Sequence, residues 1–256
     1  MLFYSAYTKR ADDSCGFYRM YFGAAAELGA EFVVFHGDST RAPFIGMDRY
    51  AEVFARLAET ARSEGVTLAH ENVSSARGGD PEFMRELRNR IGAGEISFVF
   101  DVKQALRAGH TPEEMIDVMG SDIKHVHIND WAFSNDGSRE GGCRLPGAGG
   151  LDLQAVIGRI ESYGYAGRYM IEVYRKNFVE DSELRFASLK VRSKSDECRR
   201  IYWWQTRSYR FCQRAPRLPS KFTFSLFTLT SSLKNSGCNA SGELATRTGI
   251  EPMISP

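Results

Sequence analysis

Short apolar runs alternate along the chain with longer amphipathic stretches, and this alternation restricts the fold more than any other feature. The runs are rich in β-branched and aromatic residues, as in strands that are buried on both faces of a parallel sheet. Each run ends at an acidic or imidazole side chain: His36, Glu71, Asp101, His127 and Glu172. The intervals between these residues are 35, 30, 26 and 45 positions, which suits successive βα units. The sequence therefore predicts an α/β fold with a parallel sheet.

Capping residues mark the helices between the runs. Helices are expected at about 12–28 and at about 48–63, each followed by a glycine. Another is expected after 80–82, where proline follows a capping residue, and a fourth from 111–114, which has capping-box spacing. Asp152 is expected to cap a fifth helix.

Five strand–helix units are too few to close an eight-stranded barrel, which takes about 200 residues or more. The edges of a five-stranded parallel sheet would lie open, or residues 192–256 would plug them. Exposed edges favour self-association, so a homo-oligomer is a candidate state. The sequence thus predicts a (β/α) TIM-barrel type of fold that is incomplete.

The overall composition is that of an ordinary globular protein. The chain has 256 residues, of which 43% are hydrophobic and 25% charged, and its net charge of +1 gives no reason to expect a polyanionic partner. No apolar run reaches the roughly 18 residues that a membrane helix needs, and the first residues lack the order of a signal peptide. The five cysteines include no Cys-x-x-Cys pair, so we expect reduced thiols and a cytoplasmic location.

The chain divides into two regions of unlike character. Residues 1–190 contain the βα units, and residues 191–256 form a basic tail, with eleven Lys or Arg against four Asp or Glu from residue 192 onward. Three interpretations of the tail stay open: a nucleic-acid-binding extension, a poorly ordered segment, or a segment translated out of frame. We expect it to be largely irregular and to supply no catalytic group.

Four of the strand-end residues are hard oxygen or nitrogen donors. In a (β/α) barrel the C-terminal ends of the strands meet at one mouth, where catalytic residues collect. Two Glu, one Asp and one His at that mouth suit a divalent cation. These candidate metal ligands are Glu71, Asp101, His127 and Glu172.

Six segments together resemble the sugar phosphate isomerase/epimerase family, the xylose isomerase-like TIM barrels that also include endonuclease IV. Three of them are Thr-Leu-Ala-His-Glu-Asn (67–72), Phe-Val-Phe-Asp-Val-Lys-Gln (98–104) and His-Val-His-Ile-Asn-Asp (125–130); the others are residues 27–37, 145–152 and 163–172. The resemblance covers roughly residues 1–190. It implies that these residues are the C-terminal five βα units of the barrel and that the N-terminal strands are missing.

The resemblance implies that Glu71, Asp101, His127 and Glu172 bind one divalent metal ion. Manganese is the first choice, with cobalt, magnesium or zinc as alternatives, and the family pattern favours His127 over His125 as the ligand. The implied activity is isomerisation or epimerisation of a sugar or sugar phosphate through an enediolate stabilised at the metal. Glu71 and Glu172 would transfer the proton, one removing it from carbon and the other returning it.

Further polar side chains are expected at the same mouth as substrate contacts: His36, Asn72, Lys103, Gln104 and Asp130. A structural role for His36 is an equal alternative. Lys103 can hold a phosphate or carboxylate, although an exposed loop lysine is the commoner outcome. Gln104 stands where many family members have His, and glutamine can bond a sugar hydroxyl but is no strong zinc ligand.

Two alternatives to an active isomerase or epimerase stay open. One is a catalytically inactive barrel fragment, whose ligands persist while its substrate pocket lacks strands. The other is an endonuclease IV-like DNA repair nuclease, which needs a trinuclear zinc cluster with more His and Asp ligands. The chain has five histidines in all and Gln104 at one expected ligand place, which disfavours the nuclease, and a nucleic-acid partner is not expected.

Overall fold

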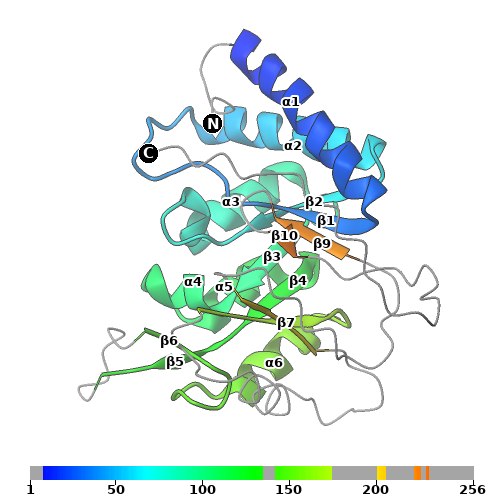
Figure 1. Cartoon of the computed structure of the whole chain (residues 1–256). Helices are drawn as coiled ribbons and strands as arrows, with labels where there is room; N and C mark the ends of the chain where they lie inside the picture. Colours follow the sequence, from blue (N-terminus) through cyan, green and yellow to red (C-terminus); the bar gives the residue numbers. More distant parts are fainter. Residues whose placement is uncertain (1–7, 135–141, 175–200, 206–221, 226–228, 231–256) are drawn as a thin grey trace, which may run out of the picture.

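Five parallel strands form the centre of the fold. The computed structural model describes residues 8–134, 142–174, 201–205, 222–225 and 229–230. The central strands are β1 (Ala30–Phe35), β2 (Thr67–Glu71), β3 (Phe98–Asp101), β4 (Ile123–Ile128) and β7 (Tyr169–Val173). They lie side by side in chain order and every neighbouring pair is parallel (Figure 1). This is the strand arrangement of a (β/α) barrel, and five such strands make up a half-barrel, which confirms the predicted fold.

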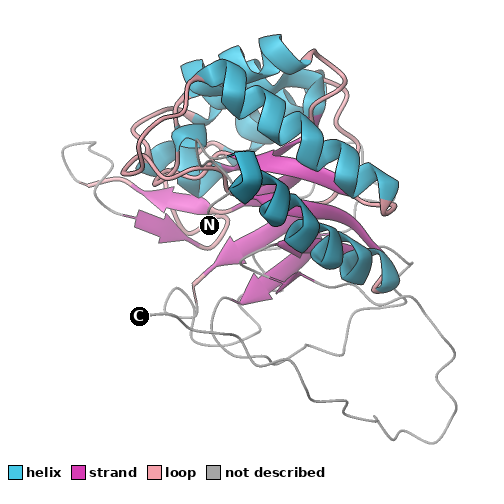
Figure 2. Cartoon of the chain, turned by 90° about the horizontal axis from the view of Figure 1, so that it is seen from above, coloured by secondary structure: helices cyan, strands magenta, loops and turns pink. Residues whose placement is uncertain are grey.

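The helices lie together on one side of the sheet (Figure 2). They are α1 (Thr8–Glu27), α2 (Met47–Ser63), α3 (Pro81–Ile91), α4 (Val102–Arg107), α5 (Pro112–Met119) and α6 (Leu153–Ser162), with 3-10 turns η2 (Arg77–Gly79) and η3 (Gly120–Asp122). The predicted starts of α2, α3, α5 and α6 are confirmed, whereas α1 begins at Thr8, ahead of the start predicted at about residue 12. The side chain of Asp80 accepts a hydrogen bond from the N–H of Glu82, and Thr111 and Glu114 form both bonds of a capping box. The short helix α4 was not predicted.

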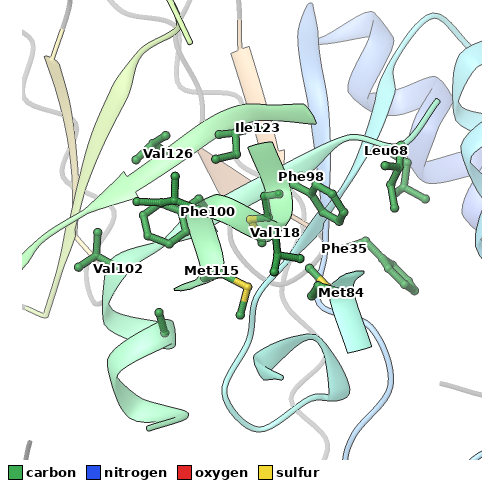
Figure 3. Packing of buried hydrophobic residues seen from close by; sticks show 14 of the residues in the cluster. Phe35, Leu68, Met84, Phe98, Phe100, Val102, Met115, Val118, Ile123 and Val126 are labelled. Carbon is green, nitrogen blue, oxygen red and sulfur yellow. The ribbon is translucent and has the colours of Figure 1, made fainter. Parts of the chain in front are cut away.

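The main hydrophobic core lies between the strands and the helices (Figure 3). Phe35, Phe98 and Phe100 of the strands lie in one cluster with Met84 of α3 and Met115 of α5, and all five side chains are buried. Burial of each such side chain stabilises the fold by roughly 1.5–3 kcal/mol. The core thus fixes the strands whose ends form the site.

Alternate residues of the same strands face the other side of the sheet. There, Val34, Ala69 and Val99 form a separate small cluster. Because side chains alternate along a strand with a period of two, the residues two positions further on face the same side. These are His36, Glu71 and Asp101.

Strands from the basic tail pair with both edges of the five-stranded sheet. β8 (Ile201–Gln205) pairs with β7, and β9 (Phe222–Ser225) pairs with β1, both in parallel, while β10 (Leu229–Thr230) pairs antiparallel with β9. The predicted plugging by residues 192–256 therefore takes the form of strand pairing. At these segments the tail is not irregular; the rest of 191–256 lies outside the described residues, and its conformation stays a prediction.

A hairpin interrupts the βα alternation after β4. It consists of β5 (Asp130–Ala132) and β6 (Gly142–Arg144), which pair antiparallel. The hairpin and α6 account for the 45-residue interval between the last two strand ends. Within the described ranges, no helix combines the length and the apolar character needed to cross a bilayer.

Candidate metal centre

The four predicted ligands converge at the C-terminal ends of their strands. The Nδ1 atom of His127 lies 2.9 Å from Glu172 Oε2, 3.2 Å from Glu71 Oε1 and 3.6 Å from Asp101 Oδ2. One ligand atom from each residue lies within 4.8 Å of the others, and this is the one group of its kind in the part of the chain that the structure describes. We call Glu71, Asp101, His127 and Glu172 the ligand cluster. Strand register explains the convergence, since Asp101 pairs with His127 across β3 and β4.

Charges and hydrogen bonds control the ionisation of the ligand cluster. Burial raises the pKa of Glu71, but hydrogen bonds from His127 and His36 outweigh it and lower this pKa to about 2. Burial also raises the pKa of Glu172, and the charges of Lys103 and His127 outweigh it, so that this pKa lies below its ordinary value. Burial lowers the pKa of His127, while the charge of Glu172 and hydrogen bonds to the carboxylates raise it well above its ordinary value. Glu71 and Glu172 are therefore anions at neutral pH.

The side chain of Lys103 contacts the ligand cluster. It is therefore not an exposed loop lysine, which was the alternative that the sequence left open. Its side chain is 2% exposed, and Nζ lies 3.1 Å from Asp101 Oδ2 and 3.0 Å from Glu172 Oε1. The cause is local: Asp101 is the N-cap of α4 and its Oδ1 accepts the N–H of Gln104 at 3.1 Å. The helix therefore begins directly at the end of β3. An Asp followed three positions later by Gln is a helix-start signal that reveals α4 in the sequence.

His36 also lies against the ligand cluster. Its Nε2 atom lies 2.9 Å from Glu71 Oε2, and its side chain is 28% exposed. The partly exposed ring thus connects the buried carboxylate of Glu71 with the protein surface.

Asn72 and Gln104 use their polar atoms to hold the strand ends. Asn72 Nδ2 donates to the carbonyl oxygen of Asp101 at 2.9 Å, and the N–H of Asp101 donates to Asn72 Oδ1 at 2.7 Å. Gln104 Oε1 accepts from the N–H and the hydroxyl of Ser74, at 3.0 and 2.8 Å. Both residues position the mouth of the half-barrel, and their contact with substrate stays a prediction.

Asp130 organises the loop between β6 and α6. Its Oδ2 accepts the N–H groups of Gly147 and Gly149 at 2.9 and 3.0 Å. Its Oδ1 accepts those of Trp131 and Leu151 at 2.7 and 3.0 Å. A β-carbon at Gly149 would collide with Asp130 Oδ1, so glycine is required there. Both oxygens of this predicted substrate contact are occupied by backbone donors.

We expect Asp130→Asn to lower the free energy of unfolding by roughly 2–4 kcal/mol, because the amide leaves buried N–H donors without an acceptor. Asp152→Asn is the matched control: Asp152 Oδ1 accepts the N–H of Ala155 as an exposed N-cap, and Asn caps equally well. Urea unfolding measures both variants. Equal stability of the two would contradict the structural role of Asp130.

The remaining strand-end histidines are structural. His70 lies on the helix side of β2, where Nδ1 donates to the carbonyl oxygen of Glu71 at 3.0 Å and the hydroxyl of Tyr50 donates to Nε2 at 2.7 Å. A β-carbon at Gly37 would collide with this Tyr50–His70 pair. His125 is buried, and its ring stacks on that of Phe32 with 6.3 Å between the ring centroids.

His70 gives stability a defined pH dependence. Burial lowers its pKa from 6.5 to about 4. The unfolded chain therefore takes up a proton on this ring near pH 6.5 while the folded chain does not. As the pH falls from 6.5 towards 4, the free energy of unfolding should decrease by up to roughly 3 kcal/mol. Burial also lowers the pKa of His125, so this residue decreases the free energy of unfolding over the same pH range. The pKa of His127 is raised instead, and its contribution to the free energy of unfolding changes only above pH 6.5.

Urea unfolding with EDTA at pH 6.5 and at pH 4.5 tests this expectation. The decrease between the two values should be smaller in His70→Gln than in the wild type, whatever the absolute stability of the variant. An equal decrease in both proteins would exclude His70 as its source.

The ligand cluster fits a divalent cation. Once His127 is neutral, as a metal ligand must be, three carboxylates face a single ammonium group, which leaves two negative charges that require a cation. The 2.9–3.6 Å spacing around His127 Nδ1 is close to the roughly 3.0–3.4 Å between neighbouring ligands that each lie about 2.1 Å from one ion. Carboxylate oxygens together with one imidazole nitrogen form a donor set that suits manganese, zinc and related ions.

Comparisons with known proteins agree with this fold. A family model described as a xylose isomerase-like TIM barrel matches residues 8–191. An uncharacterized protein of Mycobacterium leprae (strain TN) is 29% identical over 172 residues, which are 59% of this chain and 58% of that protein. The chain therefore spans little more than half the length of this curated relative.

Several solved structures are similar. A D-tagatose 3-epimerase-like protein has a TM-score of 0.55 at 23% identity, with coverage of 72% of this chain and 68% of that one. L-ribulose 3-epimerase has a TM-score of 0.52 at 22% identity, with coverage of 75% and 64%. The IolI protein with a bound zinc atom has a TM-score of 0.55 at 19% identity, with coverage of 74% and 69%. At these identities the likeness is one of fold.

Proposed function

The chain belongs to the xylose isomerase-like TIM barrel family, and on this basis we propose that it is a divalent-metal-dependent isomerase or epimerase of a sugar or sugar phosphate. The observation that carries the proposal is the convergence of three carboxylates and one imidazole at the strand ends. Two structural neighbours named as sugar epimerases or epimerase-like, and a third with bound zinc, support it.

Glu71, Asp101, His127 and Glu172 would hold the ion, with manganese as the first choice. When bound, a divalent cation polarises a sugar carbonyl and stabilises the charge of an enediolate. His127 would bind in its neutral form through Nδ1, the atom that faces the three carboxylates.

Glu71 and Glu172 would carry the proton. Both carboxylates are ionised at neutral pH, which is the form in which a carboxylate accepts a proton from carbon. They come from β2 and β7, with β3 and β4 between them, so they reach the cluster from opposite sides. One would take the proton from carbon and the other would return it to the opposite face.

His36 and Lys103 would orient the substrate. His36 is part-exposed and bonded to Glu71, so its ring can contact a sugar hydroxyl at the entrance. Lys103 has three N–H donors and two carboxylate partners, which leaves one donor for a substrate oxygen.

Hydrogen exchange tests the proposal. The protein with Mn²⁺ in D₂O should exchange the carbon-bound hydrogen next to the carbonyl of at least one ketose or aldose, free or phosphorylated, as followed by NMR. Mn²⁺ binding without exchange across the panel would support a catalytically inactive barrel fragment. Failure to bind Mn²⁺ at all would contradict the metal site.

A further inference from the structure

Within the residues that the structure describes, Lys103 is the one lysine or arginine that forms an ion pair with the ligand cluster. Its Nζ joins one oxygen of Asp101, at 3.1 Å, to one oxygen of Glu172, at 3.0 Å. The third carboxylate, that of Glu71, contacts the rings of His36 and His127 instead. In the metal-binding form, in which His127 is neutral, the three carboxylates of the cluster and the ammonium of Lys103 together carry a charge of −2.

The position of Lys103 is fixed by the start of α4. The residue lies in the first turn, immediately after the strand end, and Asp101 both caps the helix and contacts the ammonium. The side chain is 2% exposed, and Nζ lies 5.7 Å from the centre of the Tyr174 ring. Removing the ammonium from this place would leave a buried carboxylate oxygen of Asp101 and a part-buried one of Glu172 without this cation, which is costly.

We propose that Lys103 is a built-in counter-ion that sets the charge of the ligand cluster to −2 and so matches the site to divalent rather than trivalent cations. The inference rests on the proposed metal site and specifies its charge selectivity. A divalent ion brings the site to neutrality beside Lys103, whereas a trivalent ion leaves an excess positive charge. Coulomb energy is proportional to the product of the two charges. The repulsion between Lys103 and a trivalent ion is therefore about 1.5 times the repulsion between Lys103 and a divalent ion.

Calorimetric titration of the full chain with Mn²⁺ alone and with Tb³⁺ alone tests the proposal. If Lys103→Met raises the affinity for Mn²⁺ by about tenfold, it should raise the affinity for Tb³⁺ by about thirtyfold, so that the Tb³⁺ to Mn²⁺ affinity ratio increases about threefold or more. A merely structural role would change both affinities together and leave the ratio unaltered. Lys103→Arg keeps the charge and should keep the ratio within about twofold.

Lys103→Gln, which keeps a polar side chain without the charge, provides a second neutral variant should Lys103→Met fail to fold, as judged by circular dichroism. An increased ratio in either neutral variant supports the proposal, and an unchanged ratio in the folded neutral variants overturns it. The Asp101→Asn variant distinguishes a failure of this inference from a failure of the proposed metal site. If Asp101→Asn removes Mn²⁺ binding while the ratio is unchanged, only the inference fails; if wild-type binding is absent or insensitive to Asp101→Asn, the proposed function fails with it.

Discussion

Asp101→Asn should weaken Mn²⁺ binding by about 100-fold or more, since it removes one of three charges from a buried site. The substitution leaves the fold in place, because Asn keeps an oxygen that can accept the N–H of Gln104 and caps a helix as well as Asp does. Calorimetry on the full chain measures the loss.

Asp152→Asn is the matched control, because it makes the same chemical change at the exposed N-cap of α6. Its Mn²⁺ affinity should equal that of the wild type. An Asp101→Asn variant that binds within a few-fold of the control would show that Asp101 is no ligand.

Glu172→Gln should reduce hydrogen exchange on the substrate by about 100-fold to 10,000-fold at saturating Mn²⁺, because the amide cannot accept the proton. Glu71→Gln should have an effect of the same order. Saturation separates this loss from weaker metal binding, since both residues also belong to the ligand cluster. NMR exchange rates in D₂O measure it.

Glu113→Gln serves as the control for these two variants, because Glu113 lies in the exposed first turn of α5. It should exchange hydrogen at the wild-type rate. Exchange by Glu172→Gln and Glu71→Gln within about tenfold of this control would exclude the carboxylates as the proton carriers.

The ligand cluster could be predicted from the sequence because its determinants are local. Each ligand lies at or near the end of an apolar run, and the two-residue period of a strand places Glu71 on the same face as Ala69 and Asp101 on the same face as Val99. Parallel pairing in chain order then brings these strand ends together. The helix caps at Asp80 and Thr111 were predictable for the same local reason.

The partners of the polar side chains at the mouth depend on contacts between distant residues. Asp130 accepts N–H groups from a loop as far as 21 positions away, and Gln104 contacts Ser74 across 30 positions. Spacing along the chain contains no signal for such bonds. Lys103 differs in that the Asp–Gln helix start can be recognised in the sequence, although the contact of its ammonium with Glu172 depends on the pairing of β7 with β4.

The pairing of the tail strands likewise could not be predicted from local patterns in the sequence. β8 joins β7 and β9 joins β1, over sequence separations that periodicity cannot detect. Each pairing covers one edge of the five-stranded sheet. The sequence predicted that these edges would be open or plugged.

An anomalous difference map from crystals grown with Mn²⁺ tests the metal site most directly. The proposed site predicts one peak in contact with Glu71, Asp101, His127 and Glu172, at about 2.0–2.3 Å from one atom of each. Lys103 should remain beside Asp101 and Glu172. A map without a peak at the ends of β2, β3, β4 and β7, or a peak that contacts other residues, would contradict it.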